Sequence, residues 1–354
     1  MGMLPTKMKT MVLSVLVAIT HGVTASPLVA PSLSNDSDYS EYWEQQFLFD
    51  NNTVATSQFL IANLPFSRHH GMMVATLKEA DADTVIIKNG RKRSGWNFSA
   101  DQPQLSIFQH NLSGDTPGFQ LRLHNTAAEL DVDFTAGGKA VTLVGAGNKL
   151  GLPEVNLYAP SARAIGRWRD GPEIGGLGPD GAWQPIGDGF GYGLHVVQNK
   201  APNAAMKRWW RFTAGGSNGR YEPVLHAFET PKGGLHFAML LFSASTDPIR
   251  FDVNDFQISE DGKSWKINAT AGTKTLTGTM MLGNLLESFN LKDQLNGLEK
   301  LAAGSMADVS RLRYAATYRL ELNERETITI LDGMALAEDI QMGAQKAKRR
   351  RSRR

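Results

Sequence analysis

Hydrophobic and polar residues alternate one by one along several segments of the chain. The strictest alternation covers residues 130–135, 249–254, 265–270 and 314–323. This pattern places apolar side chains on one face only, which is typical of a half-buried antiparallel strand. Weaker alternation predicts further strands at 54–62, 72–77, 105–110 and 119–123. Residues 235–242 are apolar on both faces, which predicts a central strand.

Tight-turn sequences separate these segments. They are Asn51-Asn52, Asn89-Gly90, Gly137-Gly138, Gly233-Gly234 and Asp261-Gly262. Short strands in series with such turns predict an all-β fold of antiparallel strands, either a sandwich or a barrel. The segments on either side of residue 200 have comparable length and pattern. We therefore predict two β-barrels in tandem, at residues 36–200 and 201–342.

Two segments depart from this alternation. Residues 145–202 are rich in Gly and Pro and show little periodicity, which predicts a long crossover at the end of the first barrel. Leucines recur at helical spacing at positions 291, 295, 298 and 301, between Asn290 and Gly304. This spacing predicts one short helix in the second barrel, packed across its mouth or its side.

The N-terminus has the pattern of a secretory signal peptide. Lys7 and Lys9 precede an apolar run at 11–19, and Val23-Thr24-Ala25 forms a small-residue cleavage site. The chain contains no cysteine, which is unusual for an exported eukaryotic protein of this size and favours a bacterial periplasm or exterior. No later run is apolar for long enough to form a transmembrane helix. We predict a signal peptide at 1–25 and an exported mature chain, periplasmic or extracellular.

The net charge of +2 conceals an uneven distribution. Seven of the last nine residues, 346–354, are basic. Without these and the two lysines of the signal peptide, the body keeps 28 basic and 35 acidic side chains. An acidic body does not favour nucleic-acid binding, which needs a basic patch or stripe. The tail at 343–354 is either a solubilising extension or a contact for an anionic surface.

Most catalytic and metal-binding motifs are missing from the sequence. The histidines show no HExxH or other close ligand spacing, and no GxSxG nucleophile motif occurs. Residues 175–178 are Gly-rich but lack the lysine and the helix of a phosphate-binding loop. We therefore expect no metal site and no cofactor.

The segment 205–212 has the densest mixture of aromatic and basic residues in the chain. On a strand, Arg208 and Trp210 share one face, and Trp209 and Arg211 share the other. An arginine among aromatic rings either stacks on them as part of the structure or lies beside a ligand. Aromatic rings with one or two polar groups at a barrel mouth are typical of a small-molecule site.

Six segments together resemble a known superfamily. They are 39–47, 56–63, 71–77, 191–195, 206–212 and 332–338. In this order they are similar to the lipocalin-like superfamily that includes AttH proteins, carotenoid 1,2-hydratase (hydroxyneurosporene synthase) and the yeast survival-factor proteins. The resemblance implies two tandem lipocalin-like (calycin-like) antiparallel β-barrels with an apolar or isoprenoid-like ligand.

The segments that carry the resemblance also hold the candidate ligand-binding residues. These are Tyr42, Trp43, Tyr192, His195, Arg208, Trp209, Trp210 and Arg211. The resemblance implies an exported protein that binds a lipid or other apolar small molecule.

Two other functions stay open at this point. A hydratase or cyclase on the same fold would need a carboxylic acid that apolar surroundings keep neutral. Asp188 and Glu338 are the nearest carboxylic acids by position, and no catalytic residue is assigned. The third alternative is a secreted carbohydrate-binding or carbohydrate-active β-sandwich, which would need a pair of acids in an open groove.

Overall fold

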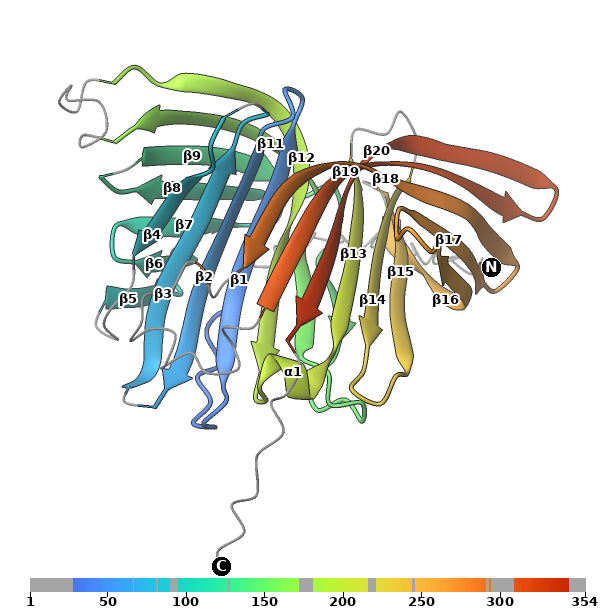
Figure 1. Ribbon diagram of the computed structural model, residues 1–354, viewed down its shortest axis with the longest axis horizontal. Coiled ribbons are helices and arrows are strands. Elements are labelled where there is room, and N and C mark those ends of the chain that lie inside the picture. The colour runs from blue at the N-terminus through green and yellow to red at the C-terminus, as the bar shows by residue number, and fades with distance from the viewer. Residues whose placement is uncertain are drawn as a thin grey trace, which may run out of the picture.

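The computed structural model describes residues 28–343, except 66, 81, 90–94, 127, 172–180, 216–220, 244–245, 291–292 and 294–308. The chain forms two antiparallel sheets that lie side by side, here named sheet A and barrel B (Figure 1). Sheet A contains β1 (Ser40–Phe49), β2 (Val54–Leu64), β3 (Ser67–Lys78), β4 (Val85–Asn89), β5 (Trp96–Ser99), β6 (Gln104–Ile107), β7 (His110–Asp115), β8 (Gly118–His124), β9 (Ala128–Thr135), β10 (Val141–Val144), β11 (Glu154–Asp170) and β12 (Gln184–Gln198). Barrel B contains β13 (Arg208–Gly215), β14 (Glu222–Glu229), β15 (Leu235–Ser243), β16 (Thr246–Ile258), β17 (Ser264–Ala271), β18 (Lys274–Asn290), β19 (Val309–Glu324) and β20 (Thr327–Met342). The predicted all-β fold class is confirmed.

The two sheets differ in closure. Barrel B is a closed barrel in which each strand pairs with its neighbours in sequence and β20 returns to β13. Sheet A has the order β4-β3-β2-β1-β12-β11-β9-β8-β7-β6-β5, and β10 pairs with β11 alone. It curves until β3 lies against β6 and β4 against β9, but no ladder between described residues joins β4 to β5. The first predicted barrel is therefore an open half-barrel.

The prediction of a long crossover at 145–202 is wrong for most of that segment. Its residues form β11 and β12, which have 17 and 15 residues. Residues 157–162 of β11 and 189–196 of β12 are buried on both faces, between the interior of sheet A and barrel B, so polarity does not alternate there. Residues 163–167 of β11 alternate between exposed and buried positions. Gly189, Gly191 and Gly193 of β12 reflect close packing, because an added Cβ at each would overlap a neighbouring group, such as the Gln46 carbonyl oxygen at Gly191.

The other predicted strands correspond to strands of the structure, with one division. Residues 105–110 are split between β6 and β7, because Phe108 adopts a left-handed backbone (φ 54°) and turns the chain. The structure describes one whole helix, the single turn α1 (Pro202–Ala205), just before β13. Asp293, the one described residue between 291 and 308, is also helical. The predicted helix at 290–304, the signal peptide, the glycines at 175–178 and the basic tail lie outside the described residues, apart from a few at their edges.

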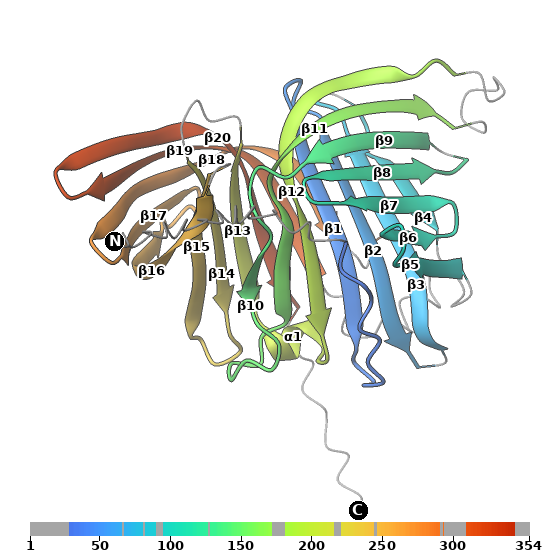
Figure 2. The same ribbon diagram turned by 180° about the vertical axis from the view of Figure 1, so that it is seen from behind.

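Three groups of buried apolar side chains form the core. One fills the interior of sheet A and one fills barrel B. The third lies between the two sheets and includes Leu194 of β12, Trp209 of β13 and Leu336 of β20. Figure 2 shows this contact from behind, where β12 lies beside β13. This shared layer brings polar side chains of both sheets together.

Candidate functional site

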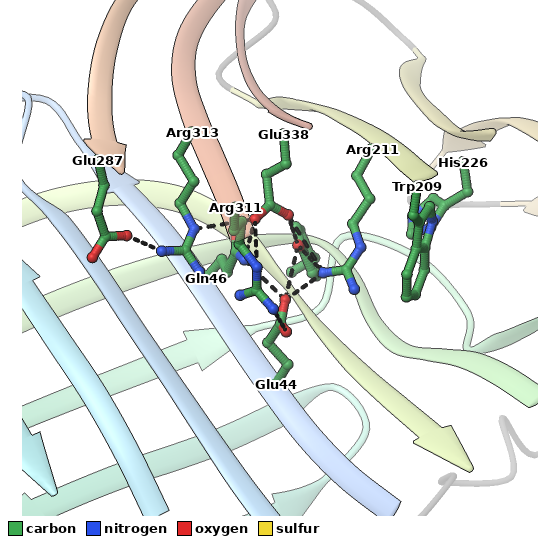
Figure 3. Close-up of polar contacts among 10 residues, drawn as sticks. Glu44, Gln46, Trp209, Arg211, His226, Glu287, Arg311, Arg313 and Glu338 are labelled. Carbon is green, nitrogen blue, oxygen red and sulfur yellow. Dashed lines mark hydrogen bonds and ion pairs between the residues drawn. The ribbon is translucent and has the colours of Figure 1, made fainter. Parts of the chain in front are cut away.

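Charged side chains from both sheets meet in the layer between them (Figure 3). Arg211 of β13 donates through Nη1 to Glu44 of β1, and the same nitrogen lies 3.4 Å from Oε2 of Glu338 on β20. Tyr192 of β12 donates its hydroxyl to Glu338 Oε2 at 2.5 Å. The side chains of the arginine and both glutamates are 1 % exposed, so this group is sealed from solvent.

Two further arginines, both on β19, complete the cluster. Arg311 Nη2 lies 2.8 Å from Glu44 Oε2. Arg313 donates through Nε to Glu338 Oε1 at 3.1 Å and through Nη1 to Glu287 of β18. The charge cluster (Glu44, Arg211, Glu287, Arg311, Arg313 and Glu338) thus pairs three carboxylates with three guanidiniums. Gln46 Nε2 donates to both Glu44 and Glu338, at 2.8 and 2.7 Å.

The arginines keep the buried carboxylates ionised. Burial alone raises the pKa of Glu338, but the charges of Arg211, Arg311 and Arg313 outweigh burial and lower it to about 2. Burial likewise opposes ionisation of Glu44, and the arginines again hold its pKa below the ordinary value. Removing one member of such a network leaves an uncompensated buried charge and costs roughly 3–5 kcal/mol. The charge cluster therefore joins the two sheets.

Trp209 and Arg211 occupy this sealed layer together. The Arg211 guanidinium lies 3.6 Å from the centre of the Trp209 ring, and Trp209 Nε1 donates to His226 Nδ1 at 3.2 Å. Burial, and then the charge of Arg211, lower the pKa of His226 well below its ordinary value. Tyr42 packs against the same layer, and its burial raises its pKa to about 12.

The opposite face of β13 points into barrel B. The Arg208 guanidinium lies 4.7 Å from the centre of the Trp210 ring. Its Nε and Nη2 also donate to the two carboxylate oxygens of Asp339, at 2.6 and 2.5 Å, in a bidentate geometry. Trp210 packs edge-on against Phe256, with ring centres 6.2 Å apart. Arg208 is thus held by a ring and a carboxylate, and its side chain stays 34 % exposed.

Trp43 and His195 lie in a third place, the interior of sheet A. Their rings stack at 4.7 Å, and His195 Nε2 lies 2.7 Å from Glu41 Oε1. Trp43 Nε1 donates to the carbonyl of Val29 at 3.1 Å. The Glu41 carboxylate also accepts the backbone N–H of Ser32 at 2.8 Å. These bonds hold the segment that precedes β1 against the sheet.

The eight candidate residues therefore do not form one site. The structure brings together Tyr42, Tyr192, Trp209 and Arg211 between the sheets. It places Arg208 and Trp210 in barrel B, and Trp43 and His195 in sheet A. The sequence pattern did not point to Glu44, Gln46, Glu287, Arg311 and Arg313. Their visible marks in the sequence are polar residues at alternate positions of a strand, Glu44 and Gln46 on the buried strand β1 and Arg311 and Arg313 on β19.

A hollow of about 460 Å³ opens beside the segment that precedes β1. It is lined by residues 28–30, by 140–142 at β10, by 156–158 of β11, and by Phe98, Ala100 and Pro103. Among the described residues of the lining none is charged, and the polar side chains are Thr142, Asn156 and Tyr158. Its volume lies in the range of small-molecule pockets and its lining is largely apolar, but the hollow is partly open to solvent. None of the eight candidate residues lines it.

Two features are absent from the described part of the chain. No group of three or more His, Asp or Glu side chains there is arranged to hold a metal ion. No helix in the same residues has the length and apolar character needed to cross a membrane.

Comparison with known proteins gives a likeness in structure but none in sequence. No family model and no curated protein matches the chain. The structure of CghA with Sch210972 matches with a TM-score of 0.60 and 8 % identity, over 90 % of this chain and 95 % of that one. Kievitone hydratase from Nectria haematococca matches with a TM-score of 0.51 and 13 % identity, over 91 % and 94 %. A putative AttH from Nitrosomonas europaea matches with a TM-score of 0.51 and 10 % identity, over 90 % and 100 %.

At such low identity the likeness establishes a shared fold. The fold that was expected from the resemblance to AttH proteins and hydratases is confirmed. The matches extend over both sheets, since each covers at least 90 % of this chain.

Proposed function

We propose that this chain binds an apolar small molecule, such as a lipid or an isoprenoid-like compound, in the hollow of sheet A. The observation that carries the proposal is the hollow itself, with its volume of about 460 Å³ and its largely apolar lining. Two of the structural neighbours support a small-molecule role on this fold. CghA was solved with Sch210972, and another neighbour is a kievitone hydratase.

The polar part of the lining suggests one polar group on the ligand. Thr142 Oγ1 donates to Asn156 Oδ1 at 2.6 Å, and Asn156 Nδ2 donates to Glu154 at 2.9 Å. Thr142 is exposed and Asn156 is half-buried, so both lie where the hollow meets solvent. A ligand with an apolar body and one polar end would place that end beside this pair.

The geometry favours binding over hydration of an alkene. A hydratase needs a neutral carboxylic acid in apolar surroundings, and no Asp or Glu is among the described residues that line the hollow. Glu338 is ionised and enclosed by arginines, and Asp188 is exposed. Carbohydrate cleavage is not favoured either, because Glu44 and Glu338 are sealed from solvent and share Arg211.

The test is to fill the hollow and measure binding of a fluorescent fatty acid. Ala140→Trp places a large side chain in the hollow, and we expect it to weaken binding by roughly tenfold or more. Ala80→Trp, at an exposed position between β3 and β4, is the matched control and should bind like the wild type. Equal binding by Ala140→Trp and the wild type, with both proteins folded, would overturn the proposal.

The proposal includes export, because the ligand would then be met outside the cytoplasm. Protein recovered from the periplasm or medium of its host should begin at Ser26 on N-terminal sequencing, as cleavage after Ala25 requires. Native mass spectrometry of the same sample should show a copurified apolar molecule that Ala140→Trp loses. Recovery in the cytoplasm alone, with residues 1–25 attached, would contradict export.

A further inference from the structure

Four segments meet at one end of the molecule, the lower end in Figure 1. These are the loop 145–153, α1 with its flanks at 199–207, the turn 230–234 with the first residue of β15, and the end of β20. Met342 donates its backbone N–H to the Lys207 carbonyl at 2.9 Å, and the Lys207 N–H bonds to Glu229. Gly151 lies beside Lys200, since a Cβ there would be 2.6 Å from Lys200 Nζ. We call these segments the α1 end.

The α1 end is cationic and carries exposed apolar side chains. Lys149, Lys200 and Lys232 are exposed, and within the described chain none of them has a carboxylate partner. Leu150 is 47 % exposed and Leu235 is 41 % exposed. Each leucine therefore lies within three residues of an unpaired lysine. A fourth lysine, Lys207, is exposed and lies 3.4 Å from Glu229.

The basic tail starts from the same end. The described chain stops at Gly343, one residue after Met342. Seven of residues 346–354 are basic, and no acidic residue follows Asp339. The tail therefore adds seven positive charges within about a dozen residues of the α1 end, whatever conformation it takes.

We propose that the α1 end docks on an anionic lipid surface. Basic residues near such a surface each gain attraction from its negative potential, and exposed leucines can enter the headgroup region. The rest of the body carries more acidic than basic residues, so the same field repels the other faces and orients this end toward the lipid. Exposed leucines give no advantage on a phosphate backbone, which is why lipid is favoured over nucleic acid.

The experiment is vesicle co-sedimentation of the full chain. We compare phosphatidylcholine vesicles with vesicles that also contain phosphatidylglycerol, at low and high salt. Binding should need the anionic lipid and should weaken with salt. The triple variant Lys149→Glu, Lys200→Glu and Lys232→Glu should bind roughly tenfold or more weakly, as should a chain whose seven basic tail residues are changed to Gln.

A matched triple variant controls for net charge alone. Lys266→Glu, Arg319→Glu and Arg325→Glu make the same change in charge on exposed positions of β17, β19 and the β19–β20 turn. This variant should keep binding within about twofold, because its substitutions lie away from the α1 end. The apolar run at 11–19 is present in every variant. If this run inserts into membranes, the protein also binds vesicles of phosphatidylcholine alone, and those vesicles therefore measure its contribution.

Three results would overturn the proposal. The first is equal loss of binding in the two triple variants, which would show that only net charge matters. The second is loss of binding in the tail variant alone, which would leave the described surface without a role. The third is tighter binding to DNA or RNA than to anionic vesicles, when Leu150→Ser and Leu235→Ser change neither nucleic-acid binding nor vesicle binding. The expected effect of the two leucine substitutions is weaker vesicle binding.

Discussion

The ionisation of Glu338 makes the stability of the charge cluster depend on pH. Burial opposes its ionisation, but Arg211, Arg311 and Arg313 lower its pKa from an ordinary 4.5 to about 2. A carboxyl whose pKa is lower in the folded state stabilises the fold fully above its unfolded pKa. That stability is lost as the pH falls through the folded pKa. We therefore expect the free energy of unfolding to fall between about pH 5 and pH 2, by on the order of 3 kcal/mol from this group.

Urea unfolding at pH 7, 5 and 3 measures this dependence. Glu338→Gln removes the titrating group, so it should be less stable than the wild type at pH 7 and should lose less stability on acidification. Asp332→Asn, at a side chain that is 65 % exposed, is the control and should show the wild-type pH profile. An unchanged slope in Glu338→Gln would contradict the assignment.

The surroundings of Arg211 show which features of single residues could be predicted from the sequence. Alternation along β13 correctly separated Trp209 and Arg211 from Arg208 and Trp210, because side chains of a strand alternate between faces. The partners of Arg211 could not be predicted in this way. Glu44 and Glu338 lie 167 and 127 residues from it along the chain. The packing of the two sheets brings Glu44 to Arg211, and the pairing of β13 with β20 sets Glu338 directly opposite Arg211.

Among the elements, β12 shows why a Gly-rich segment was mistaken for a loop. Its residues 189–196 are all buried, and glycines stand where neighbouring groups leave no room for a side chain. Gly191 lies against the backbone of Gln46 and Phe47, and Gly193 lies against the Tyr158 ring. In a sequence, a strand is recognised by the alternation of polar and apolar residues. A strand that is buried on both faces lacks this alternation, so β12 was not recognised. The hollow was missed because it has no motif and is assembled from four separate segments.

The packing of β12 predicts the effect of a single added methyl group. In Gly191→Ala the new Cβ would overlap the carbonyl group of Gln46, which is backbone and cannot rotate away. We expect a loss of roughly 2–3 kcal/mol in the free energy of unfolding. Gly145→Ala, where no atom lies within 4 Å of the added Cβ, should change stability by less than about 1 kcal/mol. A loss of stability in Gly191→Ala as small as that in Gly145→Ala would show that β1 and β12 can separate to admit the methyl group.

On the scale of the whole molecule, the two sheets share a buried apolar layer and a charge cluster. The resemblance to lipocalin-like proteins implied two barrels in tandem, and barrel B agrees with it. The open edge of sheet A could not be foreseen, because a strand pattern does not tell which outer strands pair. We expect the shared layer to couple the stability of the two sheets, because an opening of the layer would expose side chains of both.

Two adjacent tryptophans allow this coupling to be tested. Trp209 lies in the layer between the sheets, and Trp210 lies in the core of barrel B, so each substitution to Ala removes a ring of the same size. Both should cost about 3–5 kcal/mol. In hydrogen exchange measured by mass spectrometry, Trp209→Ala should speed exchange in β12 of sheet A as well as in β13. Trp210→Ala should act mainly in barrel B, near Phe256 on β16. If exchange in β12 keeps its wild-type rate in Trp209→Ala, the two sheets open independently and the layer between them does not couple their stability.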